Sequence, residues 1–145
     1  MSHATKTMRF RFPGQTLGLN AQSSGDLIRQ LGRGFSFQAV QSLESRSGIG
    51  ISRIASIIGI PARTLARRKA SGRLTADESE KLLRLSSIFE KALELFEGDN
   101  GGALVWLSSP KAELENEAPI EYARTEVGAR EVENLIGRLD HGVFS

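Results

Sequence analysis

The sequence predicts an all-α fold, and three observations lead to this prediction. No run of β-branched residues alternates with polar residues over the length of a strand. Apolar residues instead recur three and four positions apart in successive segments, which is the spacing of one helix face. Cap and stop residues, such as Thr75 with Glu78 and the later Gly98, divide these segments into about seven or eight helices.

The N-terminal half is expected to hold four short helices that follow an arm. Residues 1–23 are rich in small polar residues and predict an extended or loose arm. Ser24 is a candidate N-cap for the first helix, Gly48 and Gly59 end the second and third, and Pro61 stands where the fourth begins. The expected apolar faces of the first three are Leu27, Ile28 and Leu31; Phe37, Val40 and Leu43; and Ile51, Ile54, Ala55 and Ile58.

The C-terminal half is expected to hold one long helix and three shorter ones. Thr75 and Glu78 form a T-x-x-E capping box before a helix over residues 76–97, which we expect to pack the two halves against each other. The remaining boundaries are Pro110 after a short helix that bears Trp106, Pro119 and Thr125 at two helix starts, and Gly142 at the last helix end.

Composition excludes several kinds of site. The 145 residues include no cysteine, so disulfides, iron–sulfur clusters and thiolate zinc sites are excluded. The two histidines, His3 and His141, lie at opposite ends, which argues against a two-histidine metal centre or a His-based catalytic triad. We therefore expect no catalytic residues, no metal and no cofactor. No segment is apolar over a membrane-spanning length and residues 1–12 lack the apolar run of a secretory signal, so a cytoplasmic protein without a membrane partner is expected.

Charge is distributed unevenly along the chain. Residues 1–75 contain twelve Lys or Arg and two acids, a net charge of +10, whereas residues 76–145 contain seven Lys or Arg and fifteen acids, a net charge of −8. A basic half suits a polyanion such as DNA, and an acidic half would be repelled by the same polyanion. The two halves are therefore expected to bind different macromolecules.

Residues 51–70 have the spacing of a helix-turn-helix. Its first helix needs a small residue where the second helix crosses, which Ala55 supplies. Gly59 follows four residues later and tolerates the positive φ of the turn. Ile60 and Leu65 then supply the apolar residues that pack after the turn and inside the second helix.

The second helix of this motif is expected to present basic residues to DNA. Arg63 and Arg67 share one face and could enter a major groove, and Thr64 could contact a base or a phosphate. Arg68, Lys69 and Arg73 are expected to contact phosphates, although Arg68 occupies a late position where an apolar residue is usual. The alternative is a helical hairpin with a solvated basic face.

Two segments carry a family resemblance, R-T-L-A-R-R-K at 63–69 and A-L-V-W-L-S-S-P at 103–110. With them, the chain resembles the Xre/MbcA/ParS-like antitoxin family from about residue 35 to residue 143. Glu115-Asn116 stands where the family usually has a Gly pair, and the turn is expected to survive because Asn tolerates the left-handed conformation. Residues that recur in order with matching gaps are Trp106, Leu107, Pro110, Pro119, Thr125, Gly128, Val132 and Leu135.

The resemblance implies the antitoxin of a type II toxin–antitoxin system. It implies an Xre-like helix-turn-helix bundle, taken here as residues 24–75, followed by a small helical toxin-binding domain at 76–145. The partner would be a RES-domain toxin that degrades NAD⁺, and the complex would repress its own operon. The alternative is a stand-alone helix-turn-helix regulator without a toxin partner.

The C-terminal helix and tail are the candidate toxin-binding segment, because a terminal segment past a packed helix can reach into a concave site. An alternative is that Val143 and Phe144 cap the domain's own core. A homodimer is also expected, with surplus apolar surface from Leu27, Leu31, Phe35 and Phe37 in the N-terminal half. The candidate toxin-binding residues are Glu131, Asn134, Arg138, His141, Val143 and Phe144.

Overall fold

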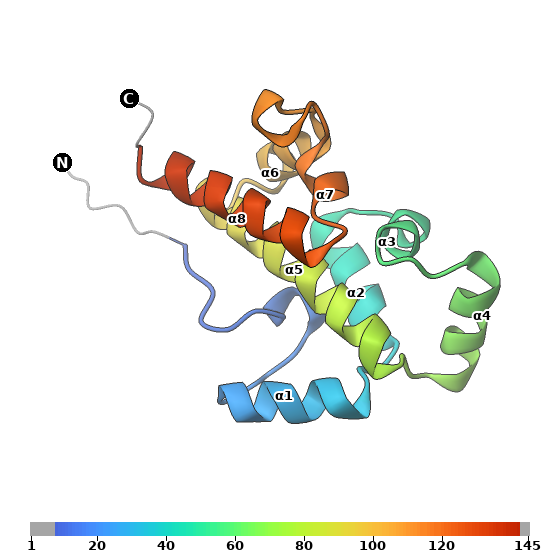
Figure 1. The fold of residues 1–145 in the computed structure, drawn as a ribbon. Helices are drawn as coiled ribbons and strands as arrows, with labels where there is room; N and C mark the ends of the chain where they lie inside the picture. The colour runs from blue at the N-terminus through green and yellow to red at the C-terminus, as the bar shows by residue number, and fades with distance from the viewer. Residues whose placement is uncertain (1–7, 143–145) are drawn as a thin grey trace.

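The computed structural model describes residues 8–142, which form eight α-helices and two short 3-10 helices and contain no strand. The all-α prediction is therefore confirmed (Figure 1). The α-helices are α1 Ser24–Arg33, α2 Gln38–Ser47, α3 Ile51–Ile57, α4 Ala62–Ser71, α5 Ala76–Leu95, α6 Asn100–Ser108, α7 Pro119–Tyr122 and α8 Glu126–Asp140. The 3-10 helices are η1 Gln15–Leu17 and η2 Ala112–Leu114.

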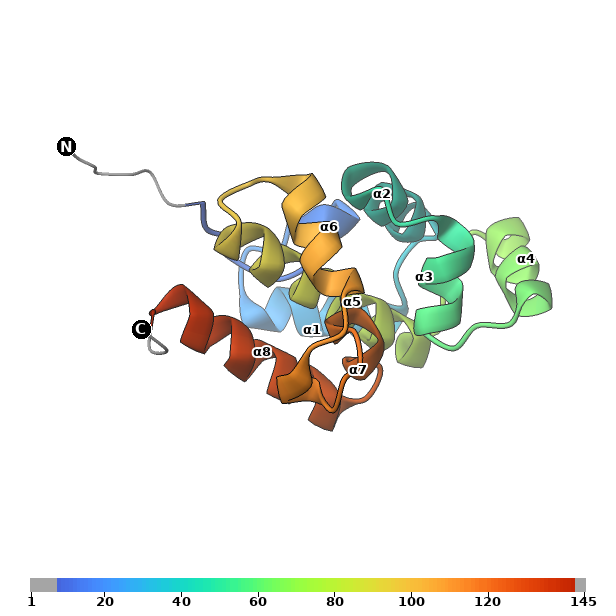
Figure 2. The same cartoon turned by 90° about the horizontal axis from the view of Figure 1, so that it is seen from above.

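The long helix α5 is the centre of the fold. It packs against α1, α2 and η1 from the N-terminal half and against α6 and α8 from the C-terminal half. Leu82, Ile88 and Phe89 of this helix are completely buried. Both halves therefore share one continuous core, as predicted for this helix. In Figures 1 and 2, α4 lies at one end of the molecule and the C-terminal end of α8 lies at the other.

Local helix signals are largely confirmed. Thr75 and Glu78 make both hydrogen bonds of the capping box before α5, and the Thr125 side chain accepts from the backbone N–H of Gly128 at the start of α8. At α1 the cap is Ser23, which accepts from the Asp26 N–H, so the assignment to Ser24 is wrong by one residue. Ile28, which was predicted to lie on the apolar face of this helix, is instead 66% exposed.

The segment before α1 differs from the expected loose arm. Thr16 and Leu17 of η1 are buried. Glu90 of α5 accepts hydrogen bonds from the backbone N–H groups of Gly14 (3.1 Å) and Thr16 (2.8 Å) and from the Thr16 hydroxyl (2.7 Å). A buried carboxylate needs such donors, and here they come from a segment more than seventy residues away. Residues 1–7 lie outside the described part of the chain.

Glu90 is expected to make stability fall as the pH rises. Burial raises the pKa of its carboxyl, although the hydrogen bonds from Thr16 and Gly14 oppose this rise. Between the ordinary pKa and the raised one, the folded state binds more protons than the unfolded state, so the free energy of unfolding decreases with pH. Glu90→Gln should flatten this decrease in denaturant titrations from about pH 4 to about pH 8, whereas Glu80→Gln on the exposed surface should leave it unchanged. An equal slope in wild type and Glu90→Gln would contradict the assignment.

Two glycines of α8 should respond oppositely to alanine. A Cβ at Gly128 would lie 1.7 Å from the Tyr122 carbonyl oxygen, whereas a Cβ at Gly137 would meet no atom within 4 Å. Gly128→Ala should therefore destabilise the fold by about 3 kcal/mol, because the backbone must shift. Gly137→Ala should stabilise it by about 0.5–1 kcal/mol, because alanine is the better helix former. Chemical denaturation of both variants measures this contrast, and similar values for the two would contradict it.

The Glu115–Asn116 turn is formed as predicted. Both residues have positive φ, 57° and 64°, and the Asn116 N–H donates to the Lys111 carbonyl at 2.9 Å.

The Trp106 side chain is only partly buried and packs against the core from outside. The Lys111 ammonium lies 5.2 Å from the Trp106 ring centroid, within the range of a cation–π contact.

The residues suggested for a dimer interface lie mostly inside the chain's own core. Leu27, Phe35 and Phe37 are buried, and Leu31 is partly buried against the same core. They do not supply the surplus apolar surface that the sequence predicted. Ile28 is the exposed large apolar residue of α1, and the homodimer itself stays a prediction.

Candidate functional sites

Helices α3 and α4 form the predicted helix-turn-helix. Ala55 is 4% exposed at the middle of α3. Gly59 has a φ of 78°, which a side-chain-bearing residue rarely adopts. The Ile60 N–H then donates to the Ala55 carbonyl at 2.8 Å, and the Ile60 side chain is buried. Leu65 of α4 is partly buried against the core.

Helix α4 presents a basic outer face. It buries none of its residues, and it stands at one end of the molecule (Figures 1 and 2). Arg63, Arg67 and Lys69 are exposed, and Thr64 is half-buried. Arg67 Nη2 donates to Thr64 Oγ1 at 3.5 Å. Arg63 and Arg67 are one turn apart, so both guanidinium groups can reach one ligand surface.

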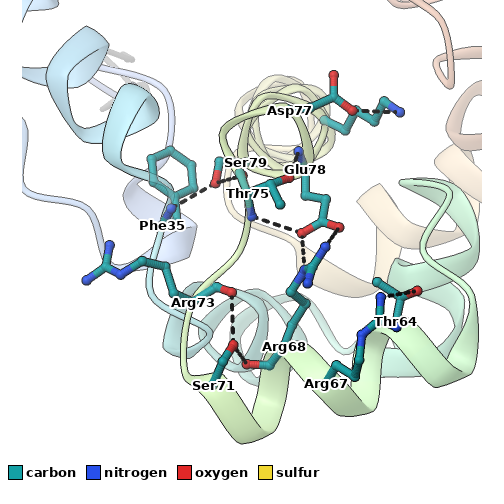
Figure 3. Close-up of polar contacts among 11 residues, drawn as sticks. Phe35, Thr64, Arg67, Arg68, Ser71, Arg73, Thr75, Asp77, Glu78 and Ser79 are labelled. Carbon is teal, nitrogen blue, oxygen red and sulfur yellow. Dashed lines mark hydrogen bonds and ion pairs between the residues drawn. The ribbon is translucent and has the colours of Figure 1, made fainter.

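Arg68 does not point outward, contrary to the sequence prediction. Its Nε and Nη2 donate to Oε1 and Oε2 of Glu78 at 2.8 and 2.9 Å (Figure 3). These hydrogen bonds hold the pKa of the Glu78 carboxyl below its ordinary value. Arg73 lies beyond α4 and is exposed, but its Nη1 donates to the Gly34 carbonyl. The structure therefore brings Arg63, Thr64, Arg67 and Lys69 together on α4 and engages Arg68 and Arg73 elsewhere.

Four candidate toxin-binding residues lie on one exposed face of α8. Glu131, Asn134, Arg138 and His141 are all exposed, while Val132, Leu135 and Ile136 are buried on the opposite side. A ring nitrogen of His141, Nδ1, lies 2.7 Å from the Gly137 carbonyl oxygen at the end of the helix. Val143 and Phe144 lie outside the residues that the structure describes.

Val127 belongs to the same face and was missed from the sequence. Its side chain is 75% exposed in the first turn of α8. Positions 127, 131, 134, 138 and 141 follow the heptad spacing that places residues along one side of a helix. We define the outer face of α8 as Val127, Glu131, Asn134, Arg138 and His141. This spacing was the signal in the sequence, since each of the four later positions lies three or four residues after the one before.

The surroundings of Val127 contain more acidic than basic side chains. Shallow hollows beside it are lined by four glutamates, Glu117, Glu121, Glu126 and Glu131, and by two arginines, Arg124 and Arg130, which pair with Glu121 and Glu126. Burial raises the pKa of the nearby Tyr122 hydroxyl, and the carboxylates of Glu115 and Glu131 raise it further. An exposed apolar side chain on a surface with an excess of carboxylates is suited to a basic protein surface with an apolar contact point.

Other kinds of site find no support in the described residues. Between residues 8 and 142, no group of three or more His, Asp or Glu side chains could hold a metal ion. In the same range, no helix is both long and apolar enough to span a bilayer.

Known proteins resemble the chain over nearly its whole length. Residues 26–87 match the antitoxin Xre-like helix-turn-helix domain, and residues 91–142 match the antitoxin Xre/MbcA/ParS C-terminal toxin-binding domain. A curated protein of Yersinia enterocolitica serotype O:8 / biotype 1B, named antitoxin Xre, is 38% identical over 144 residues, which are 99% of this chain and 97% of that protein. The chain belongs to the Xre antitoxin family.

Further relatives support this membership. An antitoxin Xre of Photorhabdus laumondii is 35% identical over 132 residues, covering 90% of the chain and 89% of that protein. An antitoxin Xre of Pseudomonas putida is 36% identical over 84 residues, covering 57% of the chain and 52% of that protein. The resemblance stated from the residues is confirmed, as is the pairing of a helix-turn-helix with a toxin-binding domain. Helix α5 contributes to both matched domains, and the division at residue 75 stays a prediction.

Proposed function

We propose that this Xre-family antitoxin binds and inhibits a RES-domain toxin that degrades NAD⁺, and that it represses its own operon by binding operator DNA. One observation carries the proposal: a single fold bears a basic helix-turn-helix face at one end and a separate exposed face on α8. An operator-binding protein acts where the bacterial DNA lies, so we also propose a cytoplasmic location. The choice of a RES-domain partner rests on the family resemblance.

On the DNA side, Arg63 and Arg67 would enter the major groove. Bidentate guanidinium contacts to guanine edges are the commonest sequence-specific contacts, and both groups are exposed on one side of α4. Lys69 and the remaining donors of Arg73 would contact phosphates, which add affinity without sequence information. Arg68 is not expected to contact DNA, because its guanidinium is bound to Glu78. A dimer through the N-terminal half would match a two-fold operator.

On the toxin side, the outer face of α8 would contact the rim of the toxin's cleft. A site that binds NAD⁺ must attract an anion and is expected to be electropositive, so a chain half with fifteen acids and seven Lys or Arg complements it. Val127 would supply the apolar contact at one end of this face. Val143 and Phe144 follow its other end in the chain and would enter the cleft.

Co-expression with the neighbouring gene product tests this function. Cells that express the RES-domain protein alone are expected to stop growing and to lose NAD⁺. Cells that also express this chain should keep both growth and NAD⁺, and the two proteins should co-purify. NAD⁺ loss that is equal with and without the chain would refute the proposal, and it would favour a regulator without a toxin partner.

A further inference from the structure

The proposed DNA-reading helix α4 is held to the rest of the protein by few contacts. None of its residues is buried, and Leu65 is its apolar residue packed partly against the core. Just beyond the helix, the Gly72 carbonyl accepts from the Phe37 N–H, and the Leu74 N–H donates to the Phe35 carbonyl. These bonds hold the end of the helix, and the Ile60–Ala55 backbone bond holds the turn before its start. Between these two ends, side-chain contacts with the rest of the fold help to fix the rotation of the helix about its axis.

The bond between Arg68 and Glu78 is such a contact. Two parallel hydrogen bonds of 2.8 and 2.9 Å join the guanidinium to the carboxylate, and the two side chains are only 23% and 13% exposed. A bidentate pair of this kind fixes orientation as well as distance. Figure 3 shows that it connects α4 to the first turn of α5.

Glu78 is itself held rigidly. Its Oε1 accepts from the Thr75 N–H at 3.0 Å, and its own N–H donates to Thr75 Oγ1 at 3.1 Å. One residue further along, the Ser79 hydroxyl accepts from the Phe35 N–H at 2.8 Å. The carboxylate that receives Arg68 is therefore part of the fixed start of α5, the central helix of the fold.

We propose that Glu78 is a positioning residue for operator recognition, which acts through Arg68 by fixing the rotation of α4 and does not contact DNA. Arg63, Arg67 and Arg68 lie on the same helix, so a rotation of α4 about its axis that moves Arg68 away from Glu78 also turns both DNA-reading side chains. This inference rests on the proposed DNA-binding function of α4.

Simple electrostatics makes the opposite prediction. Glu78 is an anion beside a DNA-binding helix, so its neutralisation should strengthen binding to any duplex if charge alone matters. It would also free Arg68 to contact a phosphate. The positioning role instead requires that loss of the charge weakens sequence-specific binding. The sign of the effect therefore separates the two interpretations.

Glu78→Gln is the test, with Asp77→Asn as the matched control. Glutamine keeps an acceptor for the Thr75 N–H and removes the charge that holds Arg68. Asp77 is the adjacent acid on the same turn, with a side chain 80% exposed and paired to Lys81 rather than to α4. Affinities are measured for a duplex from the chain's own promoter and for a random duplex of equal length.

Glu78→Gln should lower the affinity for promoter DNA at least about tenfold, the size of a lost base contact, and leave the affinity for random DNA unchanged or slightly raised. Asp77→Asn should lower neither affinity. Arg68→Lys keeps the positive charge but loses the bidentate geometry, and it should also lose promoter affinity. Promoter binding by Glu78→Gln that equals or exceeds that of wild type would overturn the proposal.

Amide hydrogen exchange separates failure of this inference from failure of the proposed function. In Glu78→Gln, the amides of α4 should exchange faster while those in the middle of α5 keep wild-type rates. Unchanged exchange in α4 would overturn the positioning role without any reference to DNA. If the wild-type protein binds promoter and random DNA equally, operator recognition is refuted. The proposed role of Glu78 in operator recognition is then refuted as well.

Discussion

Replacing Arg63 and Arg67 together with alanine is expected to lower the affinity for promoter DNA by at least about a hundredfold. Both guanidinium groups are exposed on the outer side of α4. The substitutions remove potential base contacts and two positive charges, and since neither residue is buried, the fold should be kept. Fluorescence anisotropy with a labelled promoter duplex at several salt concentrations measures the loss.

Lys69→Ala is the matched control for this variant. A residue that contacts only phosphate should lose affinity uniformly for promoter and random DNA, and its loss should reduce the salt slope by about one unit. The Arg63 and Arg67 variant should instead lose the preference for the promoter. Retained preference in that variant would show that α4 is not the DNA-reading helix.

Replacing Val127 and Glu131 together with arginine is expected to abolish toxin neutralisation. Val127 is 75% exposed and Glu131 is exposed, so the change should leave the helix intact. It places two cations on the outer face of α8, where we propose that an electropositive toxin docks. Loss of an apolar contact and addition of like charge should weaken the complex more than about a hundredfold.

The charge-matched control uses Val105 and Glu113. Val105 on α6 is 67% exposed, and Glu113 is exposed on η2. Replacing both with arginine changes the net charge equally without altering the outer face of α8. Cells that express the toxin with the control should grow and keep NAD⁺, whereas cells with the α8 variant should not. Full neutralisation by the α8 variant would place the docking site elsewhere, for example on the tail alone.

Much of the fold could be predicted from the sequence because its signals are local. A cap such as Thr75 bonds within the first turn of its own helix, and Gly59 permits the positive φ of its own turn. The packing of residues 8–23 could not be predicted in this way. Its hydrogen-bond donors at Gly14 and Thr16 reach Glu90 only after the chain has folded, and no local sequence pattern predicts a hydrogen bond between such distant segments.

The candidate sites were predicted less completely, for two different reasons. The partner of Arg68, Glu78, lies on another helix, so the sequence around Arg68 did not reveal the pair. Arg68 was therefore counted among the basic residues of the DNA face. Its position in the motif, where an apolar residue is usual, was the sign that it points inward. The spacing of Val127 to Glu131 fits the outer face of α8, but spacing alone does not tell whether a valine is buried, and its 75% exposure in the fold decides this.

We propose that two separate faces of this fold bind DNA and toxin. Measuring promoter binding and toxin neutralisation in both variants is the decisive experiment. The Arg63 and Arg67 variant should lose promoter binding and still neutralise the toxin. The Val127 and Glu131 variant should lose neutralisation and still bind the promoter. If either variant loses both activities while remaining folded, the two faces do not act separately, contrary to the proposal.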